Sequence, residues 1–354
     1  MSEPPQVSNQ ATTELMNTHG DIALFVIETE LQYLASLEII RTTSPEQVVV
    51  FSYSESLSQK LTARGVEHTY LDRDWSGTLQ KIIKIKRCLR SVVSKLRSAE
   101  PFSRILLHTP RIDQVHQNLV IHALQRNFRG VPLKLRMVPD GILNTIVEST
   151  DDTSKVSLRT RLRYLKYLPF PDLKYHYFSG CRIGIDDPLF DVLYSFSGIK
   201  TNYPEDKLRY IDIAIERRAE PKKKKKALVI GQRLLDLNLA TAHEVTAISN
   251  RLKLEVERLN VDQVHYLGHP RSSNLEFNNG YKVIEEDIFC AEELYSKTHY
   301  SYVLGCTSTA LINAKMLLSD SVVISVGMDT LYQNRTDKGN ALRYTFESAG
   351  IVVL

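Results

Sequence analysis

Short apolar runs alternate with helical patterns along most of the chain, and this alternation constrains the fold more than any other feature of the sequence. Five runs precede a lysine-rich stretch at 222–226: 21–27, 47–51, 67–71, 104–108 and 132–138. Six runs follow it: 227–231, 263–268, 281–286, 301–305, 321–325 and 350–354. Short strands that alternate with helices predict doubly wound sheets of parallel strands.

The lysine-rich stretch interrupts the alternation and indicates a boundary between two domains. A chain of 354 residues is long enough for two domains of ordinary size. We expect a flexible tail at 1–17, an N-terminal Rossmann-like domain at 18–220 and a C-terminal Rossmann-like domain at 221–354. The predicted fold class is therefore α/β, with two doubly wound parallel-sheet domains that face each other across a cleft. The pattern is weakest at 142–220.

Composition argues against several classes of protein. The hydrophobic content of 43% and the charged content of 24% are those of a globular protein. No run approaches the roughly 20 apolar residues that cross a bilayer, and the first residues lack the pattern of a signal peptide. The four cysteines form no CxxC pair, which argues against a disulfide framework and against a cysteine zinc site. We therefore expect a cytoplasmic protein.

Basic residues are clustered although the formal net charge is only +4. The clusters lie at 81–97, 157–167 and 221–226. Such clusters are typical of solvated helix faces and linkers, but they also fit a surface that meets a membrane, an acidic glycolipid or nucleic acid. The low net charge and the lack of a recognised nucleic-acid module disfavour the last of these partners.

A His-Pro-Arg triplet follows the apolar run 263–268. Pro270 forbids the strand from continuing, so His269 is held at a strand end, where doubly wound sheets bind ligands. There the imidazole can act as a general acid or bind phosphate, and Arg271 suits a phosphate or a carboxylate. The triplet fits equally well a loop histidine without a catalytic role.

Hydroxyl side chains precede a helical run near the C-terminus, at Thr307, Ser308 and Thr309. With the free N–H groups of a helix N-terminus they form an anion site, although the same residue types favour an ordinary N-cap. Glycine-rich phosphate loops are absent from the sequence, so hydroxyls and side chains must hold any phosphate. Gly231 and Gln232 follow the first strand of the C-terminal domain, at the same predicted edge.

Carboxylates supply further candidates. Asp140 lies on a turn in "VPDGILN" and can be a general base, although turn geometry alone also selects this residue type. Glu292 or Glu293 could hold the hydroxyls of a ribose, while most acids of 283–294 fit a solvated face. The sequence shows no metal-ligand spacing and no GxSxG nucleophile elbow.

Three short motifs, taken in order, resemble those of the bacterial sialyltransferases, both the lipooligosaccharide sialyltransferases and the capsular polysialyltransferases. That family carries an acidic-acidic-Gly turn, a His-Pro pair and a Ser/Thr doublet, to which "PDG" (139–141), "HP" (269–270) and "STA" (308–310) are similar. "FVIETELQYLASLE" resembles the family's first strand and its "TPLQ" helix, with Gln32 matching. "LVIGQRLL" (228–235) resembles the strand-GQ opening of the second domain. The resemblance covers most of the chain.

The resemblance implies a two-domain GT-B glycosyltransferase that is inverting, metal-independent and free of cofactors. Its donor is CMP-sialic acid or a related CMP-activated nonulosonic acid. In such an enzyme His269 protonates the departing phosphate, Asp140 deprotonates the acceptor hydroxyl, and Glu292 holds the ribose. Ser308 and Thr309 stabilise the charge on the phosphate. The other donor-side candidates are Pro270, Arg271, Thr307, Gly231 and Gln232, and the second-tier candidates are Gln32, Gly141, Arg233 and Asp236.

One departure from the family pattern leaves the general base open. The first acid of the family's turn is Pro139 here, so Asp140 is the only candidate at that motif. The lipooligosaccharide group can place the base after the first strand of the second domain, where Asp236 is the nearest equivalent.

Two other interpretations of the function also stay open. One is a transferase of the same fold for CMP-Kdo, legionaminic or pseudaminic acid, and the other is a non-catalytic nucleotide- or glycan-binding module.

The resemblance also implies partners for the chain. The acceptor is a bacterial surface glycan, lipooligosaccharide or capsule, whose precursors lie at the inner face of the cytoplasmic membrane. Lys222–Lys226 and the segment 159–166 could dock the enzyme there, at about 1 kcal/mol per basic residue near the surface. We expect no nucleic-acid partner, and a homo-oligomer is compatible with the sequence.

Overall fold

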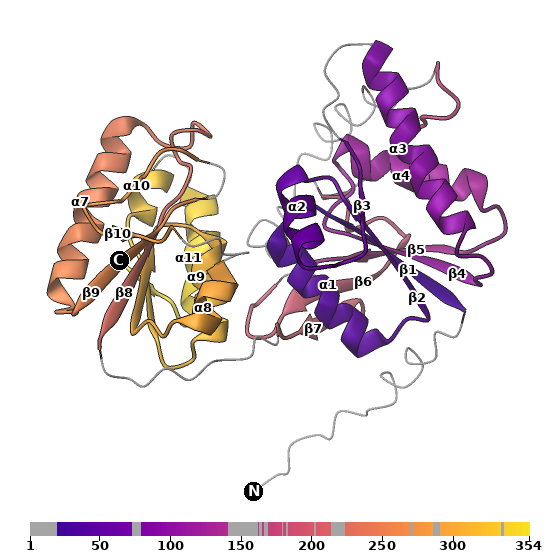
Figure 1. Ribbon diagram of the computed structural model, residues 1–354. Coiled ribbons are helices and arrows are strands. Elements are labelled where there is room, and N and C mark those ends of the chain that lie inside the picture. Colours follow the sequence, from indigo (N-terminus) through magenta and orange to yellow (C-terminus); the bar gives the residue numbers. More distant parts are fainter. Residues whose placement is uncertain are drawn as a thin grey trace, which may run out of the picture. The chain divides into compact units, whose positions relative to one another are not determined.

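The chain forms two compact units in the computed structural model (Figure 1). Unit 1 comprises Met1–Ser195 and Tyr203–Asp212, and unit 2 comprises Phe196–Asn202 and Ile213–Leu354. The structure describes residues 20–72, 79–140, 162, 165, 169–178, 180–181, 183–201, 203–213, 224–269, 272–285, 291–333 and 336–354. The predicted tail at 1–17 and the predicted boundary between 220 and 221 lie outside these residues.

Unit 1 is built on a seven-stranded sheet with the order β3-β2-β1-β4-β5-β6-β7. Its strands are β1 (Asp21–Ile27), β2 (Gln47–Ser52), β3 (Thr69–Tyr70), β4 (Arg104–Thr109), β5 (Leu133–Met137), β6 (Phe190–Phe196) and β7 (Leu208–Ile211). The pairs from β3 to β6 run parallel, with Phe25 of β1 opposite His108 of β4. All five apolar runs predicted before the lysines contain strands. The last two strands lie in the region of weak pattern and were not predicted.

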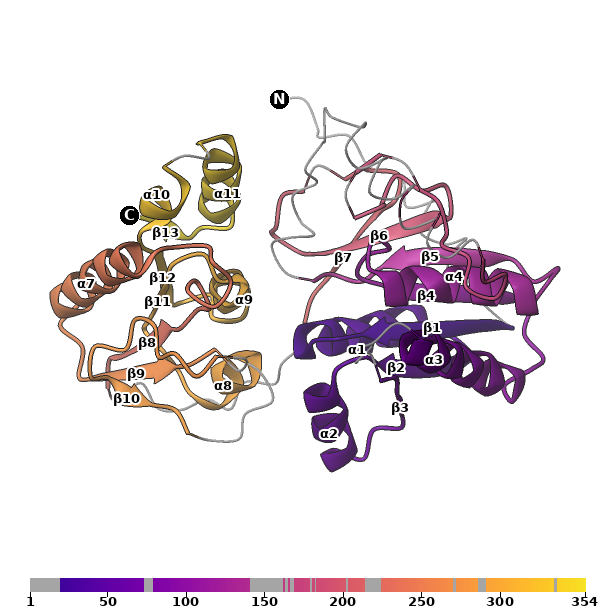
Figure 2. The ribbon, with the colours of Figure 1, turned by 90° about the horizontal axis from the view of Figure 1, so that it is seen from above.

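Four helices follow the first strands of unit 1. They are α1 (Glu30–Thr43), α2 (Glu55–Ala63), α3 (Leu79–Arg97) and α4 (Val115–Asn127). The α3 helix buries Ile85, Leu89, Val92 and Leu96, which recur every three or four residues and therefore share one helix face. This face packs into the hydrophobic core, and α3 lies beside α4 (Figures 1 and 2).

Unit 2 is built on a six-stranded parallel sheet with the order β10-β9-β8-β11-β12-β13. Its strands are β8 (Lys226–Ile230), β9 (Gln263–Leu267), β10 (Lys282–Val283), β11 (Tyr302–Gly305), β12 (Val322–Ser325) and β13 (Val352–Val353). Its helices are α7 (Ala242–Arg258), α8 (Ala291–Lys297), α9 (Thr309–Leu317), α10 (Met328–Tyr332) and α11 (Thr336–Ser348). All six apolar runs predicted after the lysines contain strands.

The order of strands reverses at one place in each sheet. In unit 1 the reversal lies between β1 and β4, and in unit 2 it lies between β8 and β11. In doubly wound sheets, ligands bind outside the carboxyl ends of the strands at such a point. The predicted α/β class with two Rossmann-like parallel sheets is confirmed, and the two reversal points are where the predicted site residues should gather. None of the described helices is long and apolar enough to cross a lipid bilayer.

Candidate functional site

Asp140 and Gln32 meet at the carboxyl edge of the unit 1 sheet. Gln32 lies in the first turn of α1, which begins under an N-cap in which the Thr29 hydroxyl accepts from the Gln32 N–H. Its Nε2 donates to Asp140 Oδ1 at 2.5 Å, and its Oε1 accepts from the Glu28 N–H at 2.7 Å. Because Gln32 is buried, both contacts restrain its amide, which in turn orients the carboxylate. Gly141 lies outside the described residues.

Glu28 and His116 form a second contact at this edge that the sequence analysis did not identify. His116 lies in the first turn of α4, and its Nε2 shares a hydrogen bond with Glu28 Oε1. Gln117 Nε2 donates to the same oxygen at 3.0 Å. Glu28 directly follows β1, so its position at a strand end is visible in the sequence. The sequence around His116 contains no signal of a functional residue. His116 lies at this edge because β4, which precedes it, is placed beside β1 in the sheet.

Arg111 follows β4, and its positive charge interacts with the carboxylates of Asp140 and Glu28. Burial disfavours its charged form, but the hydrogen bond and charge of Asp113, together with the charges of Asp140 and Glu28, raise the pKa of the Arg111 guanidinium. The unit 1 edge thus combines carboxylates, an imidazole and a permanent cation. Such an arrangement can accept a proton and orient a hydroxyl group.

Gln232 and Thr307 connect the two strands at the reversal point of unit 2. Gln232 Nε2 donates to Thr307 Oγ1 at 3.1 Å, and the Thr307 N–H donates to Gln232 Oε1 at 2.9 Å. Ser308 is the N-cap of α9, where its hydroxyl accepts from the Ala310 N–H, and Thr309 is the first residue of that helix. The structure therefore brings the predicted glutamine and hydroxyl residues together at a helix N-terminus, which attracts anions.

Gly231 has a steric reason to be glycine. A Cβ atom there would lie 2.2 Å from the Tyr266 hydroxyl oxygen. That hydroxyl donates to the Glu276 carbonyl at 2.6 Å and is therefore fixed in place. Gly231 thus lets the loop after β8 pass close to β9.

The carboxylate of Asp236 forms hydrogen bonds with other residues of unit 2. Its carboxylate accepts from Ser272 Oγ at 2.7 Å, from Asn274 Nδ2 at 2.7 Å and from Arg233 Nε at 3.2 Å. The Ser272 hydroxyl, with Arg233 and Asn274, holds the pKa of Asp236 below its usual value. Buried Glu276 adds to the connection, because its carboxylate accepts the N–H groups of residues 234 and 235. These contacts join the loop after β8 to the segment that follows His269.

His269 lies two residues beyond the end of β9 and is partly exposed. Its carbonyl accepts from the Ser272 N–H at 3.0 Å, which turns the chain at this point. Because β9 and β11 flank β8, His269 and Thr307 lie on either side of the loop that carries Gln232. Pro270 and Arg271 lie outside the described residues.

Glu292 is placed in the interior of unit 2. It lies in the first turn of α8, and its carboxylate accepts from Asn313 Nδ2 of α9 at 2.5 Å. Only 4% of its surface is exposed. This contact joins α8 to α9, and a ribose contact by Glu292 stays a prediction. Within the described ranges, no group of three or more His, Cys, Asp or Glu side chains is arranged to hold a metal ion.

Comparisons with known proteins concern the family and the fold of the chain. The family model for alpha-2,8-polysialyltransferase (POLYST) matches residues 23–327. The α/β-galactoside α-2,3-sialyltransferase of Photobacterium phosphoreum is similar in structure, with 10% identity, a TM-score of 0.54, and coverage of 94% of this chain and 98% of that one. The UDP-GlcNAc 2-epimerase of Neisseria meningitidis shows 12% identity, a TM-score of 0.48, and coverage of 93% and 92%. No curated protein matches the chain significantly in sequence.

The structural likeness shows only the fold, whereas the family match also shows the family to which the chain belongs. The match includes the reversal points of both sheets and the positions of Asp140, His269 and Ser308. The resemblance to bacterial sialyltransferases is confirmed, as is the prediction of a glycosyltransferase with a GT-B fold. By the extent of this match, the chain belongs to the alpha-2,8-polysialyltransferase family.

Proposed function

We propose that this protein transfers sialic acid, or a related nonulosonic acid, from a CMP-activated donor to a bacterial surface glycan, with inversion and without a metal ion. Sialyl transfer to a glycan accords with its family. The observation that carries the proposal is the contact between Gln232 and Thr307 at the N-terminus of α9. It supports an anion site at the reversal point of unit 2, where a nucleotide phosphate would bind.

The binding of the CMP-activated donor can be described from this anion site. The phosphate of CMP would accept hydrogen bonds at the N-terminus of α9, close to Thr307, Ser308 and Thr309. As the bond between the anomeric carbon and the phosphate oxygen breaks, negative charge grows on that oxygen. His269, on the other side of the β8 loop, would give it a proton, and the helix N-terminus would stabilise the remaining charge.

The acceptor side requires a general base, and the geometry favours Asp140 over Asp236. The carboxylate of Asp236 already accepts hydrogen bonds from Ser272, Asn274 and Arg233, which lower its pKa and make it a weaker base. Gln32 Nε2 donates to the Asp140 carboxylate and orients it at the edge of the unit 1 sheet. Asp140 would take the proton of the acceptor hydroxyl, whose oxygen forms the new bond to the anomeric carbon. The CMP released carries the proton from His269.

The test is CMP release and product formation with a panel of CMP-sugars that includes CMP-sialic acid, CMP-Kdo, and the legionaminic and pseudaminic acid donors. We expect activity with CMP-sialic acid that His269→Ala reduces by about 10²- to 10⁴-fold, the usual contribution of a general acid. His243→Ala is the matched control, because His243 is exposed near the start of α7. Near-normal transfer by His269→Ala would remove His269 from this role. Inactivity with the whole panel would favour a non-catalytic binding module.

A further inference from the structure

Unit 1 contains a pocket of about 320 Å³ between the last turns of α4 and the segment that leads into β6. Its lining includes His176, Tyr177, Phe178, Asp187 and Pro188, with Gln125 from α4. Gln125 follows His116 by nine residues on this helix, which corresponds to about 14 Å along the axis. The pocket is therefore separate from the contacts at the start of α4, where the proposed acceptor side lies.

The backbone around the pocket is held in place by buried hydrogen bonds. Asn118 of α4 is completely buried and bonds to both backbone groups of His176. Its Oδ1 accepts from the His176 N–H at 2.6 Å, and its Nδ2 donates to the His176 carbonyl at 3.0 Å. On the other side, Asp187 Oδ1 accepts from the Leu189 N–H at 2.9 Å. A wall that is fixed in advance loses little conformational entropy when a ligand binds.

An imidazole in the pocket is oriented by a buried carboxylate. His176 Nε2 and Asp187 Oδ2 share a hydrogen bond of 2.8 Å, and the side chain of Asp187 is only 4% exposed. The hydrogen lies on Nε2, because an ionised carboxylate can only accept, so Nδ1 of the neutral ring is an acceptor. Among the described residues, this Nδ1 has no hydrogen-bond partner. It is available to a donor group of a ligand.

The rest of the lining is apolar and partly aromatic. Tyr177 is 46% exposed, Pro188 is also exposed, and Phe178 is buried behind them. Tyr177 thus offers a ring face to the pocket without the need to unpack a core residue. Flat apolar walls with one oriented polar group are typical of sites for small molecules.

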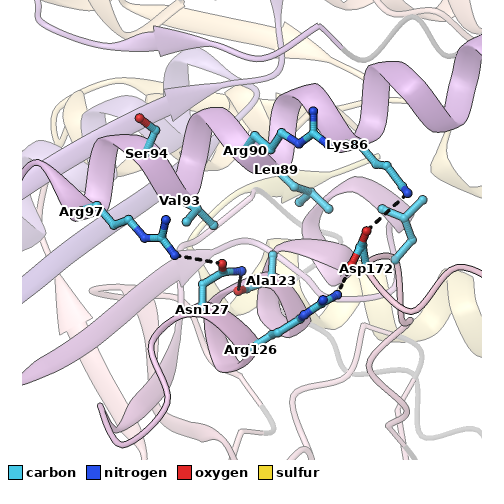
Figure 3. A pocket seen from close by; sticks show the side chains of 11 residues that line it. Lys86, Leu89, Arg90, Val93, Ser94, Arg97, Ala123, Arg126, Asn127 and Asp172 are labelled. Carbon is cyan, nitrogen blue, oxygen red and sulfur yellow. Dashed lines mark hydrogen bonds and ion pairs between the residues drawn. The ribbon is translucent and has the colours of Figure 1, made fainter.

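The pocket has no counter-charge for an ionic ligand. Within the described ranges, its lining contains no lysine or arginine, and its one carboxylate is already bonded to His176. The recess between α3 and α4 is different, since cations of both helices line it, among them Lys86, Arg90 and Arg126 (Figure 3). A charged group would lose its hydration in the pocket beside α4 without gaining a partner.

We propose that this pocket binds an uncharged sugar ring, which lies against Tyr177 and donates a hydroxyl hydrogen bond to His176 Nδ1. A sugar ring has an apolar C–H face that packs on an aromatic ring, and it carries hydroxyl donors at its edge. It therefore satisfies both kinds of wall at once. The pocket volume is of the size of small-molecule sites.

The lining disfavours two other classes of small ligand. Carboxylated sugars and nucleotides carry a charge that the pocket does not balance. A hydrocarbon would pack on Tyr177 but would cover His176 Nδ1 without giving it a hydrogen bond, which costs free energy.

This binding needs neither the donor nor the proposed base, so it goes beyond the proposed function. A neutral unit of a glycan that is held here stays near the enzyme between encounters, which raises its effective concentration. Tyr177 would therefore affect the KM for acceptors that contain neutral sugars and leave kcat unchanged.

The test records saturation-transfer NMR of the full chain without donor, with galactose, glucose, N-acetylglucosamine, N-acetylgalactosamine and sialic acid. We expect a dissociation constant on the order of 1–10 mM for at least one neutral sugar, as for a ligand with so few atoms. Tyr177→Ala should weaken it about three- to tenfold, the usual effect of losing one aromatic contact. Tyr210→Ala is the matched control, because Tyr210 is exposed on β7 outside the pocket.

His176→Ala tests the hydrogen bond and should weaken binding by a similar factor. This variant leaves the Asp187 carboxylate buried without its partner and can fail to fold. Tyr177→Ala keeps the proposal testable in that case, because it removes a side chain that is half exposed.

Three results would overturn the proposal. They are a lack of saturation transfer to every neutral sugar, tighter binding of sialic acid than of the neutral sugars, and equal affinity in the parent and in folded Tyr177→Ala. Repeating the titration with His269→Ala separates this site from the proposed function. Unchanged sugar binding in that variant, together with loss of transfer, supports an independent site, and loss of sugar binding would contradict it.

Discussion

At the scale of single residues, function depends on side chains whose partners are far away in the sequence. Gln32 and Asp140 are separated by 108 positions, yet one amide group holds the carboxylate at 2.5 Å. Glu28 and His116 are separated by 88 positions and meet at the same edge. A single substitution at such a contact should change the geometry of the site more than the fold.

Gln32→Leu should lower kcat by about 10- to 100-fold, because a general base that is displaced by about 1 Å loses much of its effect. The KM for the donor should stay unchanged, since Gln32 and the proposed donor site belong to different units. The measurement is steady-state transfer with each substrate varied in turn. Gln125→Leu, at an exposed position of α4, is the control. An unchanged kcat would show that Asp140 needs no orientation by Gln32.

Asp140→Asn and Asp236→Asn should have different kinetic effects. Asp140→Asn removes the proposed base and should reduce kcat by about 10²- to 10⁴-fold. Asp236→Asn should weaken the connection between the loops after β8 and β9, and so raise the KM for the donor with a much smaller effect on kcat. The reverse pattern would assign the base to Asp236.

His108 should make stability depend on pH. Complete burial, followed by the charge of Arg136, lowers the pKa of His108 well below 6.5, so the imidazole is neutral in the folded state. As the pH falls below about 6.5, the unfolded chain takes up a proton there that the folded chain does not. Stability should therefore fall by up to about 1.4 kcal/mol per pH unit below that value. Denaturant unfolding at pH 7.5 and 5.5 measures this.

The comparison for this prediction is His108→Phe, since Phe25 stacks on the imidazole at 4.2 Å between ring centroids and could pack against another ring. The variant should lose part of the pH dependence between these two values. His243→Phe, at an exposed position, should keep it. Identical pH dependence in the parent and in His108→Phe would contradict the assignment.

At the scale of elements, the loops after parallel strands shape the candidate donor site. Gln232 connects the loop after β8 to the loop after β11, and Asp236 connects it to the segment after β9. The loop after β8 is therefore restrained by hydrogen bonds to both of its neighbouring loops. The close approach at Gly231 allows this arrangement, because Tyr266 occupies the space of a side chain.

Gly231→Ala should destabilise unit 2 by about 1–3 kcal/mol and raise the KM for the donor, because the new Cβ would overlap the Tyr266 hydroxyl. Thermal unfolding and donor kinetics measure the two effects. Gly268→Ala is the matched control, since the nearest atom to its Cβ would lie at 3.7 Å, an ordinary contact. Adding Tyr266→Phe to Gly231→Ala should recover part of the stability. Equal stability of both alanine variants would contradict the steric account.

At the scale of the whole molecule, the basic residues before β8 have a proposed use as a membrane contact. Lys222–Lys226 with the segment 159–166 would contact an anionic membrane. Lys224 and Lys225 are exposed, and Lys226 begins β8, whereas Lys222, Lys223 and most of 159–166 lie outside the described residues. Membrane contact and a cytoplasmic location remain proposals.

Binding to vesicles that contain an anionic phospholipid should weaken steeply as salt rises from 50 to about 500 mM, since screening shortens the range of the attraction. Changing Lys222–Lys225 to Gln should reduce binding at low salt, by about 1 kcal/mol for each lysine near the surface. Arg87→Gln, at an exposed position of α3, is the control and should bind vesicles as the parent does. Binding that is independent of salt would refute electrostatic docking.

The sequence by itself determined the class of fold and the strand ends where candidate residues stand. Apolar runs and helical spacing are local properties, so they showed eleven of the thirteen strands in the part of the chain that the structure describes, and they placed Asp140, His269 and Thr307 after strands. The pattern missed β6 and β7. In β6, Asp191 and buried Ser195 interrupt the apolar pattern, and Asp191 pairs with Arg136 of β5.

Only the tertiary structure decided which of these residues meet. The sheets place β4 beside β1 and β11 beside β8, so contacts such as Gln32 with Asp140 and Gln232 with Thr307 depend on strand order. It also placed Asp236 in a network of hydrogen bonds, Glu292 in the interior, and the cations of α3 beside α4. The physical reason is that a hydrogen bond between distant residues depends on how the chain packs, whereas periodicity reports only the local backbone.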